Sequence, residues 1–146
     1  MIWLRIVLAI LLLLQAASTG FPLMGFAAYR LGVIHPTAGP AVLMISLWSA
    51  TPDWQLVVWL AAVLLLPVAA LRLVLRRPAL WFYVAGIGLN MGLTQLMHLS
   101  GAYRRVFGTA ALRFNYDRLA VLVLVGLLIW WVEQRPVKAI SPPASP

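Results

Sequence analysis

The chain has 146 residues, of which 64% are hydrophobic and only 10% charged, and its mean hydropathy is +0.97. Soluble domains usually carry about a quarter charged residues, so this composition excludes an ordinary soluble domain and predicts an all-α integral membrane protein. The formal net charge is +8. Because the basic residues stand at the ends of apolar runs, we expect them to contact anionic lipid head groups and predict no nucleic-acid partner. The absence of cysteine excludes disulfides and thiolate metal sites.

The first apolar run lies between Arg5 and Arg30 and predicts a membrane span over 3–28. Residues 1–20 also have the outline of a signal peptide, with one early arginine, an apolar stretch and a cluster of small residues. The apolar character continues as far as Phe26, so we expect an uncleaved first span.

The next uncharged stretch is interrupted by a turn-forming segment, 35–40, which contains two prolines. Only residues 41–50 remain as an apolar run. As a helix this run would rise about 15 Å, half the thickness of a bilayer. We therefore predict a short interfacial or re-entrant segment here.

A second span is predicted over 54–75, with Pro67 inside it as the expected site of a kink. The double arginine Arg76 and Arg77 then marks a tight corner at the membrane surface, where both side chains are expected to contact lipid head groups. The third predicted span is 79–100.

The longest polar connection, 101–117, carries Arg104 and Arg105, which we also expect to contact lipid head groups. A fourth span is predicted over 116–133. Aromatic residues are typical of the membrane–water interface, and the last turn of this span contains two of them, Trp130 and Trp131.

These segments predict a single polytopic transmembrane domain, 1–135, folded as a bundle of about four transmembrane helices. The Pro- and Ser-rich tail, 136–146, is expected to be flexible. The basic residues divide almost evenly between the two sides, but the double arginine lies in the tightest loop and is hard to translocate. We therefore expect both termini in the cytoplasm, with the protein in the bacterial inner (cytoplasmic) membrane.

Polar side chains make the third span distinctive. On a helical wheel Asn90, Thr94 and His98 form one stripe, with Tyr83 close to the same line. The opposite face contains the small residues Ala85, Gly88 and Gly92. Because glycines four residues apart allow another helix to approach closely, we expect this face to pack against a helix.

The polar stripe has two interpretations. It can hydrogen-bond neighbouring helices, or it can bind the polar head of a lipophilic molecule such as a quinone, haem or pigment, with His98 as a metal-ligating side chain. The only other histidine, His35, lies in a loop, and the three carboxylates stand at three different span ends. No metal site, catalytic pair or particular cofactor follows from the sequence.

The sequence therefore predicts a protein that is not an enzyme: a multi-pass subunit or an accessory or assembly factor of a larger membrane complex, such as a bioenergetic one, with other membrane subunits as partners. The alternative is a small membrane protein that binds a lipophilic cofactor along the third span. Arg5 near the start of the first span and the small four-span outline resemble DoxX-like membrane proteins. The resemblance implies a small membrane protein of that type and assigns no role to any residue.

Overall fold

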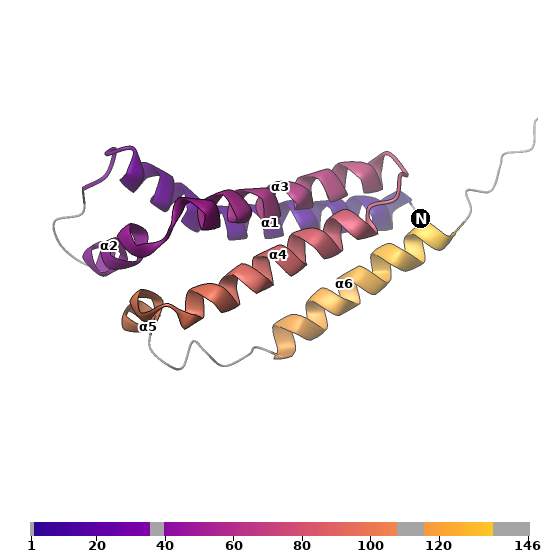
Figure 1. Ribbon diagram of the computed structural model, residues 1–146. Helices are drawn as coiled ribbons and strands as arrows, with labels where there is room; N and C mark the ends of the chain where they lie inside the picture. The colour runs from indigo at the N-terminus through magenta and orange to yellow at the C-terminus, as the bar shows by residue number, and fades with distance from the viewer. Residues whose placement is uncertain (1, 36–39, 108–115, 136–146) are drawn as a thin grey trace, which may run out of the picture.

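The computed structural model describes residues 2–35, 40–107 and 116–135, and every regular element within them is a helix. The helices in chain order are α1 (Ile2–Arg30), α2 (Pro40–Ala50), α3 (Asp53–Val74), α4 (Leu80–Leu99), α5 (Gly101–Phe107) and α6 (Tyr116–Gln134) (Figure 1). The all-α class is thus confirmed for the described residues. The tail that we expected to be flexible, 136–146, lies outside them.

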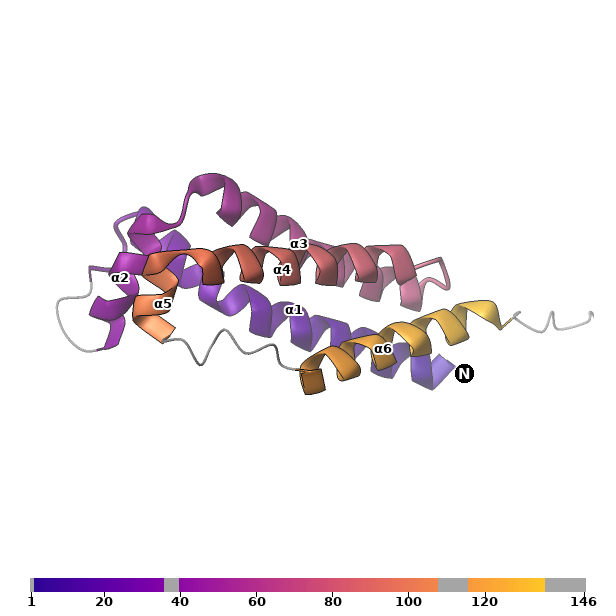
Figure 2. The ribbon, with the colours of Figure 1, turned by 60° about the horizontal axis from the view of Figure 1, so that its bottom comes forward.

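The long helices pack side by side. Helix α1 runs along α3 and α3 along α4, whereas α6 contacts α4 and α1 over a much shorter stretch (Figures 1 and 2). Helices α2 and α5 lie together at one end of the bundle. The start of α1, the α3–α4 corner and the end of α6 lie at the opposite end. The beginning of α1 and the end of α6 therefore share one end of the molecule.

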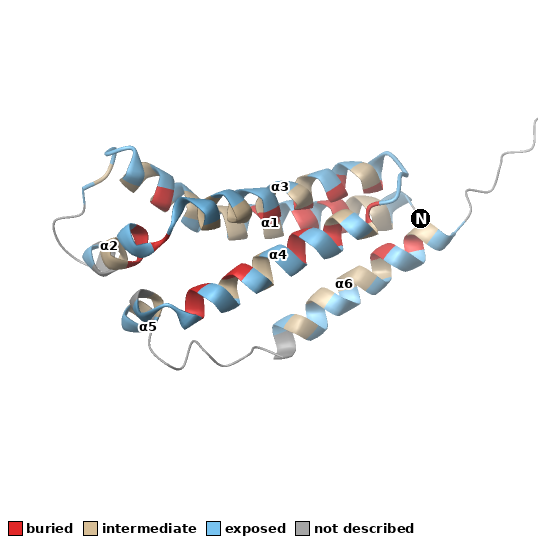
Figure 3. Cartoon of the chain, viewed as in Figure 1, coloured by how far each residue is buried: buried red, intermediate tan, exposed pale blue. Residues whose placement is uncertain are grey.

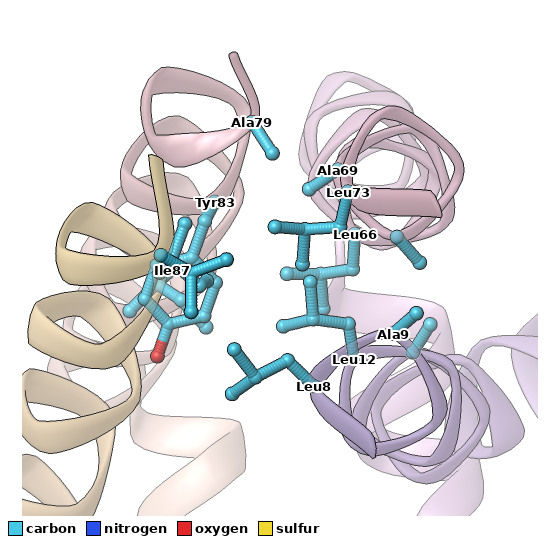
Figure 4. Packing of buried hydrophobic residues seen from close by; sticks show 13 residues of the cluster. Leu8, Ala9, Leu12, Leu66, Ala69, Leu73, Ala79, Tyr83 and Ile87 are labelled. Carbon is cyan, nitrogen blue, oxygen red and sulfur yellow. The ribbon is translucent and has the colours of Figure 1, made fainter. Parts of the chain in front are cut away.

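Two clusters of buried side chains hold the helices together. The terminal cluster lies near the shared end, and Figure 4 shows Leu8 of α1 and Leu66 of α3 facing Tyr83 and Ile87 of α4. Its buried members are Leu8, Ala9, Leu12, Ala16, Leu66, Ala69, Ala70, Leu73, Ala79, Tyr83, Ile87, Ile129 and Val132. The aromatic cluster lies toward α2 and α5, and its buried members are Phe26, Leu47, Trp48, Leu93 and Met97.

All four long helices expose large apolar side chains. Figure 3 shows exposed residues along the outer faces of these helices. Examples are Leu14, Leu64, Leu71, Trp81, Leu89, Leu124 and Leu127. Soluble proteins expose single apolar residues routinely, but contiguous apolar surfaces of this kind mark contact with a membrane or a partner.

Two of the described helices, α1 and α3, are long and apolar enough to cross a membrane by length and composition. Helix α4 is of similar length but carries the polar stripe, and α6 has charged residues near both ends. Pro67 lies inside α3, which continues to Val74. The predicted short segment, 41–50, is the helix α2.

Candidate functional site

The polar stripe of α4 lies on the side of the helix that faces the rest of the protein. Tyr83 and His98 are buried, with 3% and 7% of their surface exposed, whereas Asn90 and Thr94 are half-buried. Gly86 is buried on the same side.

Tyr83 connects α4 to α6. Its hydroxyl donates a hydrogen bond to the backbone carbonyl of Leu122 at 2.8 Å. A Cβ added to Gly126 of α6 would lie 3.3 Å from Cε1 of the Tyr83 ring. The tyrosine ring therefore fits against a part of α6 that has no side chain, and its polar end is satisfied by the same helix.

Thr94 and His98 form hydrogen bonds along their own helix. The Thr94 hydroxyl donates to the Asn90 carbonyl at 2.8 Å, and His98 Nδ1 lies 2.6 Å from the Thr94 carbonyl. Because a carbonyl only accepts, the neutral His98 ring carries its proton on Nδ1 and has its lone pair on Nε2. The centre of the Tyr103 ring lies 4.4 Å from that of His98. The arrangement leaves one imidazole nitrogen able to accept a hydrogen bond or to bind a metal.

The small residues expected to pack against another helix lie on the exposed side of α4. Ala85, Gly88 and Gly92 are exposed, and a Cβ added to either glycine would have nothing within 4 Å. The close approach inside this chain occurs at Gly86 instead, where an added Cβ would lie 3.2 Å from the Ala62 carbonyl oxygen of α3. Helix packing at the predicted face thus requires another chain and stays a prediction.

A network that the sequence analysis did not identify ties the shared end of the bundle together. The Arg5 side chain of α1 donates to the Val132 carbonyl of α6 at 2.9 Å and to the Leu73 carbonyl of α3 at 3.4 Å. Glu133 Oε1 of α6 accepts from the backbone N–H groups of Ala79 and Leu80 at 2.5 and 2.9 Å. The two charged side chains therefore satisfy backbone groups at the ends of α3, α4 and α6.

The positions of Arg5 and Glu133 in their own helices are the signal that could have identified them from the sequence. Arg5 lies near the start of α1 and Glu133 near the end of α6. The helix dipole disfavours a cation at a helix start and an anion at a helix end. Both side chains instead contact oppositely oriented ends of neighbouring helices, where the same dipole effect is favourable.

Other arginines hold further helix ends. Arg30 donates to the Thr51 carbonyl at 2.7 Å and lies 3.6 Å from Asp53. Arg104 donates to the His98 carbonyl at 3.1 Å, next to the carboxyl end of α4.

The remaining predicted lipid-contact residues lie on the surface. Arg76, Arg77 and Arg105 are exposed, and Trp130 and Trp131 are exposed to 49% and 40%. The two tryptophans line a shallow apolar hollow on α6 together with leucines of the same helix. The guanidinium of Arg135 lies 3.9 Å from the centre of the Trp131 ring.

One buried polar atom lacks a partner among the described residues: the indole nitrogen Nε1 of Trp59. Trp59 packs edge-on against Phe26, with 5.5 Å between ring centres, at the border of the aromatic cluster. Tyr103, which contacts His98, borders the same cluster. No group of three or more metal-ligating side chains occurs in the described ranges.

Comparisons with models of protein families, with curated proteins and with solved structures give no match to this chain. The resemblance to DoxX-like membrane proteins consequently remains one of outline.

Proposed function

We propose that the chain is a four-span protein of the bacterial inner membrane, crossed by α1, α3, α4 and α6, with α2 and α5 at one surface. The observation that supports this proposal is the distribution of charge. No charged residue occurs in 6–29, 54–71, 78–103 or 119–132, and these windows contain the middle of each of the four long helices. These helices have 29, 22, 20 and 19 residues and are about 28 to 44 Å long, so each is close to or longer than a hydrocarbon core of about 30 Å.

The shared end of the bundle is the proposed cytoplasmic side. It carries the double arginine at the α3–α4 corner, together with the start of α1 and the end of α6. Helix α5, with Arg105, lies at the other end.

The natural chain has no cysteine, so single cysteines can be labelled without background. We expect Arg77→Cys to react with a membrane-impermeant maleimide only in inverted vesicles and Arg105→Cys only in intact spheroplasts. Labelling of both positions from the same side would refute the four-span topology. Recovery of the protein in the soluble fraction would refute membrane insertion altogether.

Within the membrane, we propose that the protein is a non-catalytic subunit or an accessory or assembly factor of a larger membrane complex, of which a bioenergetic complex is one example. The open face of α4 around Gly88 and Gly92 supports a partner helix, because small residues allow backbones to approach closely. The described charged side chains are at the helix ends, and several of them are used to join the helices. They are thus placed for structural contacts.

The partner proposal can be tested by mild-detergent purification after cross-linking. Gly88→Leu and Gly92→Leu should leave the isolated chain folded, since each site has open space around it, and should reduce the recovery of co-purifying subunits. Ala61→Leu provides a matched control, because it makes a comparable change on the exposed side of α3. Equal recovery from all three variants would exclude this face as the contact.

A second candidate function is the binding of a lipophilic cofactor, such as a quinone, haem or pigment, near the carboxyl end of α4. Its support is Nε2 of His98, which has no hydrogen bond within the described residues, while Nδ1 is held by the Thr94 carbonyl, the arrangement common to metal-ligating histidines. The unpartnered indole nitrogen of Trp59 adds a hydrogen-bond donor at the border of the nearby aromatic cluster.

Absorption spectroscopy and mass spectrometry of lipid extracts separate the two functions. A stoichiometric chromophore or quinone that is lost in His98→Ala but kept in His35→Ala would favour the cofactor. A purified protein without any bound lipophile, in constant ratio to other subunits, would exclude it.

A further inference from the structure

Helix α1 ends in a Schellman motif, a common helix termination in which one residue takes the left-handed conformation. The Val33 N–H donates to the Ala28 carbonyl at 2.9 Å, and the Gly32 N–H donates to the Tyr29 carbonyl at 3.1 Å. Gly32 has a φ of 70°. Glycine is the usual residue here because it has no Cβ to clash in this conformation.

Helix α3 ends in the same motif with an arginine in the glycine position. The Arg77 N–H donates to the Arg72 carbonyl at 2.8 Å, and the Arg76 N–H donates to the Leu73 carbonyl at 3.2 Å. Arg76 has a φ of 56°, the only positive value at a described residue other than glycine. A residue with a side chain is strained in this conformation. An arginine at this position therefore indicates that its guanidinium has a role that offsets the strain.

The guanidinium groups of Arg76 and Arg77 differ from those around them. Arg5 is hydrogen-bonded to α6, Arg72 donates to the Pro78 carbonyl, and Arg135 stacks on a tryptophan. Arg76 and Arg77 are exposed, and within the described part of the chain neither side chain has a hydrogen bond, an ion pair or a ring contact. Both are therefore free to bind an external anion.

The surroundings of this corner indicate which anion. Trp3 and Trp81 lie in the first turns of α1 and α4 and are exposed to 76% and 77%, as expected for aromatic side chains at the level of lipid head groups. The acidic side chain at this end, Glu133, already accepts two backbone hydrogen bonds from α4. The corner thus combines uncompensated positive charge with an adjacent apolar and aromatic surface, which a free anion would not use.

We propose that Arg76 and Arg77 bind the head-group phosphate of an anionic phospholipid at the α3–α4 corner. In this proposal the left-handed conformation of Arg76 lowers the stability of the backbone and is retained because it serves this contact. The proposal rests on the membrane placement described above. The two guanidinium groups offer several N–H donors to the oxygens of one phosphate, and their positive charge exceeds its single negative charge. In this proposal the acyl chains lie along the exposed apolar faces of α3 and α4.

The test is thermal unfolding of the full chain in neutral detergent, with added phosphatidylglycerol or phosphatidylcholine. We expect phosphatidylglycerol alone to raise the unfolding midpoint of the natural chain, because a ligand that binds only the folded state stabilises it. Each of Arg76→Gly and Arg77→Gln should reduce the apparent affinity for phosphatidylglycerol about fivefold, the contribution of one arginine near an anionic surface. Arg76→Gly should also raise the midpoint in phosphatidylcholine, because it relieves the left-handed strain.

Control variants and a second anion complete the test. Arg76→Lys keeps the charge and should retain most of the phosphatidylglycerol effect, and Gln134→Ala, which changes an exposed uncharged side chain at the same end of the bundle, should retain all of it. An unchanged phosphatidylglycerol effect in the double variant of Arg76→Gly and Arg77→Gln would overturn the proposal, as would an equal effect of inorganic phosphate. If the chain inserts into membranes but responds equally to both lipids, this proposal alone fails, whereas a soluble chain refutes the membrane placement as well.

Discussion

Glu133, in the last turn of α6, caps the first turn of α4, since its Oε1 lies 2.5 Å from the backbone nitrogen of Ala79. The same oxygen accepts the N–H of Leu80 at 2.9 Å. A carboxylate at a helix start satisfies amides that have no partner in the helix and is favoured by the helix dipole. This contact matters for α6, because that helix touches the bundle over only a short stretch.

Glu133→Ala should destabilise the chain by about 1–2 kcal/mol, since it removes a charged cap and leaves the amides of the buried Ala79 and the half-buried Leu80 without this partner. Reversible unfolding in mixed micelles measures the change. Gln134→Ala changes an exposed neighbour and should have an effect below about 0.5 kcal/mol. Equal effects of the two substitutions would show that the cap contributes nothing.

The stability of the chain should also depend on the shape of the Arg5 side chain. Its two terminal nitrogens reach carbonyls on two different helices, at Leu73 and Val132. A lysine carries one compact ammonium and cannot reproduce this fork. We expect Arg5→Lys to lose about 1 kcal/mol and Arg5→Ala about 1.5–3 kcal/mol in the same unfolding measurement. If lysine preserved full stability, charge alone, and not the two-helix contact, would explain the role of Arg5.

The helices themselves were predictable from the sequence. Uncharged apolar runs bounded by Arg30, Arg76 and Arg104 correspond to helices in the structure, because each run is long enough for one helix and each end carries charge or a turn residue. The joining of α1, α3, α4 and α6 by Arg5 and Glu133 was missed. The hydrogen-bond partners of both side chains are backbone groups far away in the sequence. Because every residue type has a backbone carbonyl, and all but proline an N–H, the sequence does not mark such partners.

The sequence also did not show which face of α4 packs against α3. The wheel separates the stripe around Asn90 from the face around Gly88, but it does not say which glycine touches a neighbour within the chain. Gly86 does so, and Gly88 and Gly92 do not. The spacing of two glycines suggested packing, whereas the chain uses a single glycine on the other side of the helix.

This difference gives a matched pair of substitutions. Gly86→Leu should destabilise the isolated chain by about 1–3 kcal/mol, because the new side chain would collide with the Ala62 carbonyl and with side chains of α3. Gly88→Leu should be neutral or slightly stabilising, by up to about 1 kcal/mol, because leucine favours a helix more than glycine does and the site is open. Unfolding of both variants in detergent, without partner subunits, provides the comparison. A large loss from Gly88→Leu under these conditions would contradict the open face.

Stability should also fall at high pH through Tyr103 of α5. Burial raises the pKa of this tyrosine above its usual value of 10.0. Below pH 10 the side chain is neutral in both the folded and the unfolded chain, so its contribution is constant. Between pH 10 and the higher pKa of the folded state, the unfolded chain has already lost the proton that the folded chain keeps, so the free energy of unfolding decreases. Unfolding curves from pH 8 to 11 should show the natural chain losing stability above pH 10 relative to Tyr103→Phe, with a constant difference at lower pH. Parallel curves throughout this range would mean that Tyr103 is not buried in the folded chain.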